Sequence, residues 1–402
     1  MRKTVVTLAV CALAAAGCGT EDRDRPDGPQ RSVKPGGPRW TYDRISEEPA
    51  KLTDVLATAD DDIWVAGTRV STGTGKPVAS PDDGFLLHHD GKRWKRRPMP
   101  ASLGDSVHEA RLDAVDSGGF LLTAGKQDRS AWRMAHWDGT RWTPLPGPPP
   151  GTAGSRGIVD VRAFAADDIW ALRGDSLAYH WDGARWSATE LPATVRALDG
   201  VASDDLWAVG HRDTGMDRAG GPETEYTQPA AVHWDGRAWK LVRTPEYRFS
   251  DPVPPEPGAH LGQVLAVAED DVRAYGEHTY NHGETEDEPA DEQVSLRWNG
   301  SRWARQPGAR GDCAGRAPVA LDGDRGMFLD GNRYLTEDGS CVRIHRPRLP
   351  HTDGISRRSQ QSLWLAAVEP VPGTDEVLGV GHVQVNQPGN PTGRAVVVRL
   401  ER

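Results

Sequence analysis

One phrase returns along this chain: HWDGTRW at residues 136–142, HWDGARW at 180–186 and HWDGRAW at 233–239. Weaker copies read HHDGKRW at 88–94 and RWNGSRW at 297–303, and a degenerate copy reads TEDGSCV at 336–342. A partner phrase lies upstream of several copies, as DDIWVAG from Asp61, DDIWALR from Asp167, DDLWAVG from Asp204 and DDVRAYG from Asp270. Recurrence at such a spacing is the signature of a repeat architecture.

The two phrases predict two tight turns in an antiparallel sheet. Asp-Gly between aromatic residues is a strong hairpin signal, because Asp and Gly accept the positive backbone angles that such turns use. The two Trp residues of each full copy then face each other across the hairpin, and such pairs contribute roughly 0.2 to 1 kcal/mol. The DD phrase predicts a second turn that leads into a short apolar strand, covered on both faces. Each repeat is therefore expected to form four strands.

Seven such units can be counted, over approximately 52–98, 110–146, 158–192, 195–245, 262–307, 316–347 and 362–402. The last unit supplies only three strands. The segment PRWTYDRI at 38–45 has the pattern of the missing fourth, with Trp40 in the place of the second repeat Trp. Radial repetition closed by both chain ends protects the sheet edges. The sequence predicts an all-β β-propeller of seven blades, and six stays an alternative because the unit at 316–347 is degenerate.

These DDxWAVG and HWDGxxW repeats resemble those of secreted bacterial β-propeller proteins, and the resemblance covers roughly residues 38–402. Kelch and WD40 propellers are similar only distantly. The resemblance implies the architecture and says almost nothing about activity.

The N-terminus has the layout of a signal peptide. Arg2 and Lys3 precede an apolar run at 5–16, which is followed by Gly17 and Cys18. The segment resembles a bacterial lipoprotein signal, which implies cleavage before Cys18 and lipid attachment to its sulfur. Ordinary secretion is the alternative. The expected organisation is a signal peptide at 1–17, a flexible lipid-anchored tether at 18–37 and the propeller at 38–402, held at the outer face of the cytoplasmic membrane.

Charge and cysteine content narrow the expected partners. The formal net charge is −10, and loss of Arg2 and Lys3 with the signal makes it −12. This charge disfavours nucleic acid and a polybasic membrane contact, so membrane contact is expected through the lipid alone. Cys313 and Cys341 remain as one possible disulfide of an exported protein, with two free thiols as the alternative. The predicted topology places them at opposite ends of a blade.

The topology separates the repeated turns from the variable loops. The DD and DG turns share one face, and the irregular loops emerge on the other, where function tends to lie. The loops at 212–229 and 277–293 are the main candidates. Oxygen and imidazole ligands in the acidic loop could bind a divalent cation, but HxxxH outside a helix does not place both rings on one side, so no metal and no cofactor are expected. The candidate binding residues are Asp217, Arg218, Tyr226, Glu277, His278, His282, Glu286 and Asp287.

No enzyme signature stands out. The chain has no GxSxG, HExxH or phosphate-cradling glycine loop, and the repeated His is expected to make structural hydrogen bonds. We therefore assign no catalytic residue. The leading hypothesis is a monomeric, non-catalytic binding module for an envelope protein or glycan. The alternative is a surface glycan-active hydrolase or lyase, which a cluster of carboxylates with Arg, Tyr or His at the axial mouth would favour.

Overall fold

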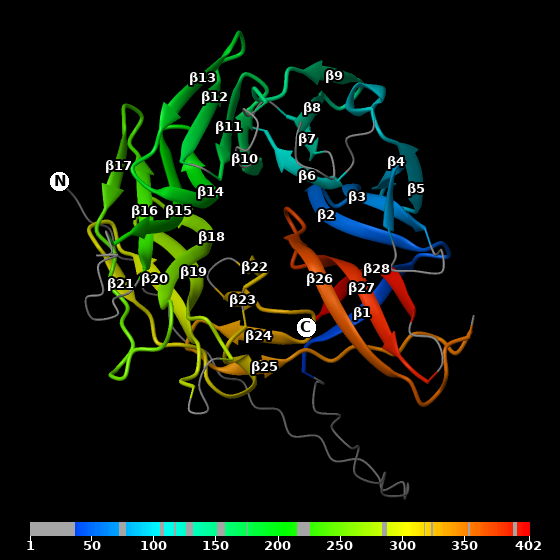
Figure 1. Ribbon diagram of the computed structural model, residues 1–402. Coiled ribbons are helices and arrows are strands. Elements are labelled where there is room, and N and C mark those ends of the chain that lie inside the picture. The colour runs from blue at the N-terminus through cyan, green and yellow to red at the C-terminus, as the bar shows by residue number, and fades with distance from the viewer. Residues whose placement is uncertain are drawn as a thin grey trace, which may run out of the picture. The chain divides into compact units, whose positions relative to one another are not determined.

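The computed structural model describes residues 37–402 except for twelve short stretches. Those stretches are 72–77, 105–107, 116–117, 126–131, 151–156, 175, 215–225, 284–287, 317, 323–324, 353 and 389–391. The described residues form seven four-stranded antiparallel blades arranged radially around an axis (Figure 1). The unit Gly37–Arg402 contains every blade and the strand that closes the ring. The structure confirms an all-β propeller of seven blades, and six blades is wrong.

Blades 1 to 4 follow one another along the chain, each from its inner to its outer strand. Their strands are β2 (Ala50–Ala59), β3 (Asp62–Ser71), β4 (Val78–His89) and β5 (Trp94–Pro98) in blade 1; β6 (His108–Ala114), β7 (Phe120–Gly125), β8 (Trp132–Trp137) and β9 (Trp142–Leu145) in blade 2; β10 (Ile158–Ala165), β11 (Asp168–Arg173), β12 (Leu177–Trp181) and β13 (Trp186–Glu190) in blade 3; and β14 (Thr194–Ala202), β15 (Asp205–Asp213), β16 (Thr227–Trp234) and β17 (Trp239–Val242) in blade 4.

Blades 5 and 6 keep this order, and blade 7 is built from both chain ends. Their strands are β18 (Gly258–Ala268), β19 (Asp271–Thr279), β20 (Glu292–Trp298) and β21 (Trp303–Arg305) in blade 5; β22 (Ala320–Leu321), β23 (Gly326–Phe328), β24 (Arg333–Thr336) and β25 (Cys341–Arg343) in blade 6; and β26 (Gln360–Pro370), β27 (Val377–Asn386), β28 (Thr392–Glu401) and β1 (Arg39–Ile45) in blade 7. Two 3-10 turns, η1 (Ala101–Leu103) and η2 (Gly311–Cys313), lie in connections. No helix among these residues is long and apolar enough to cross a membrane.

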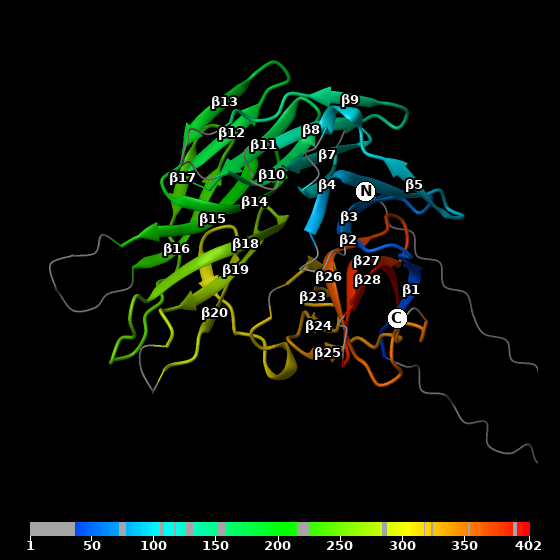
Figure 2. The ribbon, with the colours of Figure 1, turned by 45° about the vertical axis from the view of Figure 1, so that its right-hand side comes forward.

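The N-terminal strand closes the ring as the sequence predicts. β1 pairs antiparallel with β28, with Arg39 opposite Glu401 and Trp40 opposite Leu400 (Figure 2). Trp40 is fully buried, and its indole N–H donates to the carbonyl of Gly331 in blade 6 at 2.9 Å. The first strand of the chain thus completes blade 7 and also binds blade 6.

In blades 1 to 5 the DG or NG turn is a four-residue hairpin loop held by its Asp or Asn side chain, and in blade 6 the loop has five residues. In blade 2 the carboxylate of Asp138 accepts the backbone N–H groups of Thr140 and Arg141 at 2.8 and 2.9 Å. Gly139 has a φ of 92°, which a side chain would strain. The expectation that Asp also takes a positive angle is wrong, because Asp acts here as a side-chain acceptor. Trp137 and Trp142 face each other across the hairpin, with ring centroids 5.2 Å apart.

The two repeated phrases occur together because their turns pack on each other within a blade. A Cβ atom placed on Gly91 of the DG turn would lie 2.8 Å from the Cβ of Asp61 in the DD turn. The same approach is 2.7 Å between Gly183 and Asp167. Only glycine fits so closely against the neighbouring turn. The Gly of one phrase and the first Asp of the other are therefore one structural unit.

The hydrophobic core lies between the blades, in one cluster at each interface. The interface of blades 4 and 5 contains thirteen buried hydrophobic residues, with Trp207 at its centre. The interface of blades 5 and 6 contains four among the residues that the structure describes: Tyr275, Cys313, Met327 and Leu329. Blade 6, with strands of two to four residues, is the thinly packed part of the ring.

Candidate functional site

The repeated His residues are bound by the DD phrases. In blade 4 the Nε2 atom of His233 lies 2.6 Å from Asp205 Oδ1, and the His ring stacks on Trp207 at 4.3 Å. The same arrangement holds for His180 with Asp168 and Trp170, and for His88 with Asp62 and Trp64. The Asp–His pair recurs in three blades, so we assign these residues a structural role within the blade.

Blade 2 shows what happens when the DD phrase is lost. Its sequence reads SGG in place of the DD turn, so no Asp stands opposite His136. The Nε2 atom of His136 is buried and has no hydrogen-bond partner among the described residues. The expected structural hydrogen bond is therefore present for His180 and His233 and not observed for His136.

An axial cavity of about 840 Å³ runs between the inner strands of the blades. Five of its ionisable residues form a network of ion pairs across blades 2 to 4. Arg111 pairs with Asp160, and Arg162 lies 3.3 Å from both Asp113 and Asp199. This is the kind of carboxylate and Arg cluster that the sequence analysis associates with an enzyme.

Most of these carboxylates bind the backbone of the next blade. Asp54 of blade 1 accepts the N–H of Leu112 in blade 2 at 2.8 Å. In the same way Asp160 accepts Leu198 N–H, Asp199 accepts Ala266 N–H, and Glu369 of blade 7 accepts Ala57 N–H. With the ion pairs between blades 2 and 3, these contacts link blades 7, 1, 2, 3, 4 and 5 in a continuous series. We call these contacts the axial clips. Among the described residues, no clip reaches blade 6.

Burial shifts the protonation of three axial acids. Desolvation raises the pKa of Asp54 to about 7, that of Asp113 to about 6 and that of Glu369 to about 8. The Oδ2 atom of Asp113 is buried and has no hydrogen-bond partner among the described residues. Among the described residues, Asp113 is thus the one acid of the axial network with a buried carboxylate oxygen that has no hydrogen-bond partner.

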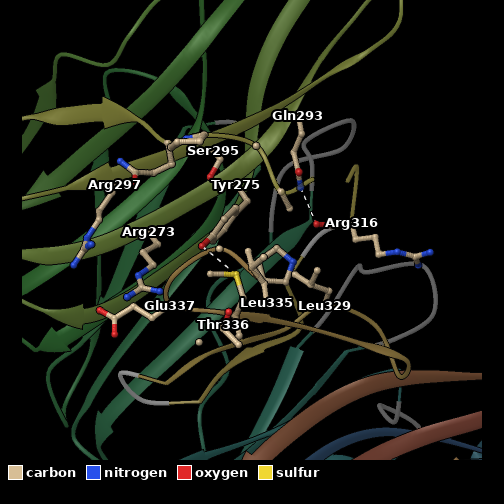
Figure 3. A pocket seen from close by; sticks show the side chains of 18 of the residues that line it. Arg273, Tyr275, Gln293, Ser295, Arg297, Arg316, Leu329, Leu335, Thr336 and Glu337 are labelled. Carbon is tan, nitrogen blue, oxygen red and sulfur yellow. Dashed lines mark hydrogen bonds between the residues drawn. The ribbon is translucent and has the colours of Figure 1, made fainter. Parts of the chain in front are cut away.

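A second hollow, of about 440 Å³, lies between blades 5 and 6 (Figure 3). We call it the 5/6 pocket. It occurs where the repeat loses its Trp residues. Arg273 replaces the Trp of the DD phrase, and Glu337 and Val342 replace the two Trp residues of the DG phrase. The pocket is lined on one side by β19 and β20 and on the other by β23, β24 and the DG turn of blade 6.

Charged groups hold one end of the 5/6 pocket. Asp271 accepts from the guanidinium of Arg297 at 2.8 and 2.9 Å, and from that of Arg273 at 3.4 and 3.2 Å. The side chain of Arg273 is only 13% exposed. The negative charge of Glu337 acts on the same guanidinium from the opposite blade. Figure 3 shows Arg273 and Glu337 next to each other at this end.

The middle of the pocket contains several apolar side chains and the hydroxyl group of Tyr275. Leu296 and Leu329 are buried, and Leu335 is partly exposed. Tyr275 is buried, and burial raises its pKa to about 12. Its hydroxyl donates to the thioether sulfur of Met327 at 3.5 Å, and a thioether is a weak acceptor. The pocket therefore combines an apolar wall with a phenol O–H that a ligand oxygen can satisfy better.

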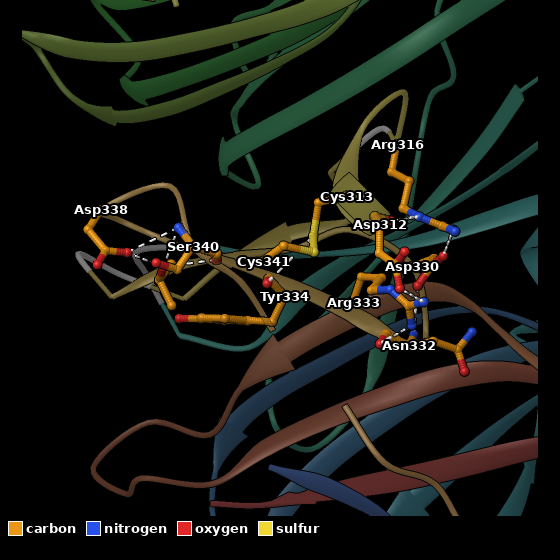
Figure 4. Close-up of a disulfide and its surroundings, with 11 residues drawn as sticks. Asp312, Cys313, Arg316, Asp330, Asn332, Arg333, Tyr334, Asp338, Ser340 and Cys341 are labelled. Atoms are coloured by element: carbon orange, nitrogen blue, oxygen red, sulfur yellow. Dashed lines mark hydrogen bonds and ion pairs between the residues drawn. A yellow bond between two sulfur atoms is a disulfide. The ribbon is translucent and has the colours of Figure 1, made fainter. Parts of the chain in front are cut away.

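A disulfide between Cys313 and Cys341 stands beside this pocket, with a Cα–Cα distance of 5.7 Å (Figure 4). It ties the connection after blade 5 to β25. Arg316 pairs with Asp330, and Arg333 pairs with Asp312, so the same connection is held by two ion pairs. The predicted topology placed the two Cys residues at opposite ends of a blade. They lie close enough to bond because the strands of blade 6 are only two to four residues long.

The proposed loop residues that the structure describes do not line the 5/6 pocket. His278 is buried, stacks on Phe249 at 4.0 Å and lies 3.3 Å from Glu292. His282 is about half exposed and lies between Glu288 and Asp291, which raise its pKa. The two His side chains have different partners, and no group of metal-ligating side chains occurs in the described part of the chain.

The other proposed loop residues fall into two groups. Glu277 is exposed on β19, opposite Gln293. Tyr226 is exposed, and its backbone N–H donates to the carbonyl of Pro257 in the connection between blades 4 and 5. Four more, Asp217, Arg218, Glu286 and Asp287, lie outside the described residues, as do Cys18 and the tether at 18–36.

Sequence reasoning missed the 5/6 pocket because it looked for function on the variable loops. A signal was present. The copies DDVRAYG and TEDGSCV both lack their Trp residues, and they belong to consecutive units. Adjacent blades share an interface, so two adjacent losses predict a hollow between them.

No protein-family model matches this sequence, and no curated protein matches it either. The chain is similar in structure to several solved proteins. These include "YCF48 bound to D1 peptide" (12% identity, 91% of this chain and 97% of that chain, TM-score 0.48), the β-propeller domain of the trilobed protease from Pyrococcus furiosus (9%, 86% and 98%, 0.45) and the SapL1 lectin in complex with alpha methyl fucoside (13%, 76% and 98%, 0.38). These likenesses agree with the fold and carry no argument about a ligand.

Proposed function

We propose that this protein is a lipid-anchored, extracytoplasmic β-propeller that binds a partner at the cell envelope without catalysis, and that the 5/6 pocket is its binding site. One observation carries the proposal. The 5/6 interface, where the repeat loses its Trp residues, has a cavity of about 440 Å³ with polar groups at one end. A preformed, partly apolar hollow with a few fixed polar groups is the usual form of a ligand site.

The sequence supports the anchor and the compartment. Cys18 follows a signal-like segment, and lipid on its sulfur would hold the propeller outside the cytoplasm through the tether at 18–37. A disulfide between Cys313 and Cys341 fits an oxidising compartment. The negative net charge favours a protein or glycan partner over nucleic acid.

Two measurements test this function. Cys18→Ser should move the protein from the membrane fraction to the soluble fraction, and continued membrane association would refute the lipid anchor. Residues 37–402, immobilised and exposed to detergent-solubilised envelope extract, should retain a partner that a pocket variant, Met327→Trp, does not retain. The surface variant Arg185→Trp, at a side chain 84% exposed on blade 3, should retain it. Equal capture by both variants would remove the 5/6 pocket as the site.

A glycan-active enzyme is the second candidate, and one observation favours it. Asp113 has a spare buried oxygen in the axial cavity, a raised pKa and a neighbouring Arg162. A carboxyl group with a pKa near 6 can act as a general acid. Asp113→Asn should abolish glycan hydrolysis if this reading holds. Absence of hydrolysis by the unaltered protein on envelope glycans would discard it.

A further inference from the structure

The regular interfaces show what normally fills the space of the 5/6 pocket. Between blades 4 and 5, Trp207 lies against Trp298 and Trp303, with ring centroids 5.0 and 5.1 Å away. Trp170 lies in the same way against Trp234 and Trp239, at 5.0 and 5.5 Å. A Trp ring of one blade therefore packs against two Trp rings of the next blade.

The interface of blades 5 and 6 lacks all three rings of this cluster. In the aligned repeats, Arg273, Glu337 and Val342 stand at the three positions, and Arg273 and Glu337 line the hollow at this interface. Blade 5 keeps the repeat hairpin, with Asn299 accepting the N–H groups of Ser301 and Arg302. In blade 6 the hairpin differs, because Leu335 pairs with Cys341 and Asp338 accepts the backbone N–H of Ser340. The hollow thus lies at the interface where the repeat would place its rings.

The groups that replace the rings are suited to bind one. A guanidinium is planar, weakly hydrated and attracted to the face of an aromatic ring, most strongly to indole. Arg273 is fixed by Asp271 and largely withdrawn from solvent, so its plane is held in place before a ligand arrives. Tyr275, Met327 and Leu335 supply apolar and sulfur contacts that also favour a ring.

The hydrogen-bonding groups match an indole in a peptide. The carboxylate of Glu337 lies exposed at the guanidinium end and can accept an indole N–H. The Tyr275 hydroxyl donates to the sulfur of Met327 and also interacts with the Arg273 side chain, and its O–H can donate instead to a peptide carbonyl next to the ring.

From this geometry we infer that the 5/6 pocket binds a tryptophan side chain of a partner polypeptide, which takes the place of the ring that the repeat omits. The inference rests on the proposed function and names the chemistry of its ligand. The partner ring would lie against Arg273 and Met327, with its N–H directed to Glu337.

The methyl group of Met327 provides a direct reporter. The protein has five Met residues, and Met327 alone lines this pocket. Residues 37–402 with 13C-labelled Met methyl groups should be titrated with N-acetyl-tryptophanamide. An aromatic ring over Met327 should move its methyl signal upfield and saturably, while that of Met99 stays in place. A Kd of roughly 0.1 to 1 mM is expected for a ligand of this size.

Two substitutions at one residue make the test specific. Arg273→Trp restores the repeat residue, should fold because blades 1, 3 and 4 carry Trp at this position, and should abolish the shift by filling the pocket. Arg273→Gln leaves the pocket open and removes the cation, so binding should weaken by about tenfold. Arg185→Trp should bind as the unaltered protein does.

Several outcomes would overturn the inference. They are no saturable Met327 shift in the unaltered protein, an unchanged shift in Arg273→Trp, and a saturable response to methyl glycosides in place of the tryptophan probe. Because the probe needs no cellular partner, this result is separate from envelope capture. Capture through the 5/6 pocket without probe binding would overturn the tryptophan ligand and leave the proposed function standing.

Discussion

The interface of blades 4 and 5 and the interface of blades 5 and 6 are built from the same repeat and have opposite character. In the first, Trp207 is packed between two further Trp rings and the interface is full. In the second, an Arg and a Glu stand at ring positions beside a cavity. One interface of a closed ring can lack its aromatic packing, because the contacts of the neighbouring blades still hold the ring together. A repeat protein can thus form a cavity where the large side chains of the repeat are absent.

The axial clips show the same contrast. They join six of the blades in series and, among the described residues, stop on both sides of blade 6. Blade 6 is held by other means, namely the disulfide to Cys341, the Trp40 indole bond to Gly331 and the ion pair between Arg402 and Asp322. Its stability should therefore respond to different perturbations from those that affect the other blades.

The largest expected difference comes from truncating the equivalent residue at the two interfaces. Trp207→Ala should destabilise residues 37–402 by about 3 to 5 kcal/mol, because it empties a fully packed site. Arg273→Ala should cost only about 1 kcal/mol, because Arg297 continues to neutralise Asp271. Chemical denaturation of both variants measures this difference. Equal losses would show that the hollow interface contributes as much to stability as the filled one.

Removal of the disulfide should have the next largest effect and should be local. Cys313→Ser combined with Cys341→Ser releases a cross-link between residues 28 apart, which is worth about 3 kcal/mol. Hydrogen exchange should increase in β22 to β25 and in the connection at 306–319, and should stay unchanged in blade 4. Exchange that increases evenly around the ring would mean that blade 6 does not open by itself.

The pH dependence should be the smallest effect and should act on the clipped blades. Burial raises the pKa values of Asp54, Asp113 and Glu369, so the folded state holds these protons more tightly than the unfolded chain. Their contribution is complete below about pH 4 and is lost as pH rises through 6 to 8. The Tm should fall by roughly a few degrees between pH 5 and 8.

Glu369→Gln supplies the control for this pH effect, because the amide cannot ionise and can still accept the Ala57 N–H. Its Tm should change less with pH than that of the unaltered protein. The pH effect has another origin if the two slopes are the same.

The fold was predictable because its information is local. Asp138 and Gly139 specify a hairpin on their own, and the pairing of Trp137 with Trp142 follows from that turn. Ring closure was predictable because the last blade has only three strands from its own unit, and the strand at 38–45 has no other blade to complete. The precise role of Asp in the turn was not, since side-chain capping and a positive φ give the same sequence preference.

The candidate site was harder to predict because it depends on residues that meet only across blades. Arg273 and Glu337 are 64 positions apart, and nothing in either local sequence shows that they face each other. The axial network is similar, since Arg111 and Asp160 belong to different blades. His278 and His282 were singled out for their spacing, and the structure gives each its own partners. Proximity in sequence was the wrong guide to proximity in space.

The pairing of β1 with β28 also sets the order in which the molecule can be finished. Trp40 is synthesised about 360 residues before Leu400, its partner on β28, so β1 stays unpaired until that strand exists. Until then blade 7 has an open edge, and blade 6 lacks the indole bond to Gly331. A chain that stops even ten residues early lacks β28 and cannot close. The ring can therefore close only after the chain has been made as far as β28.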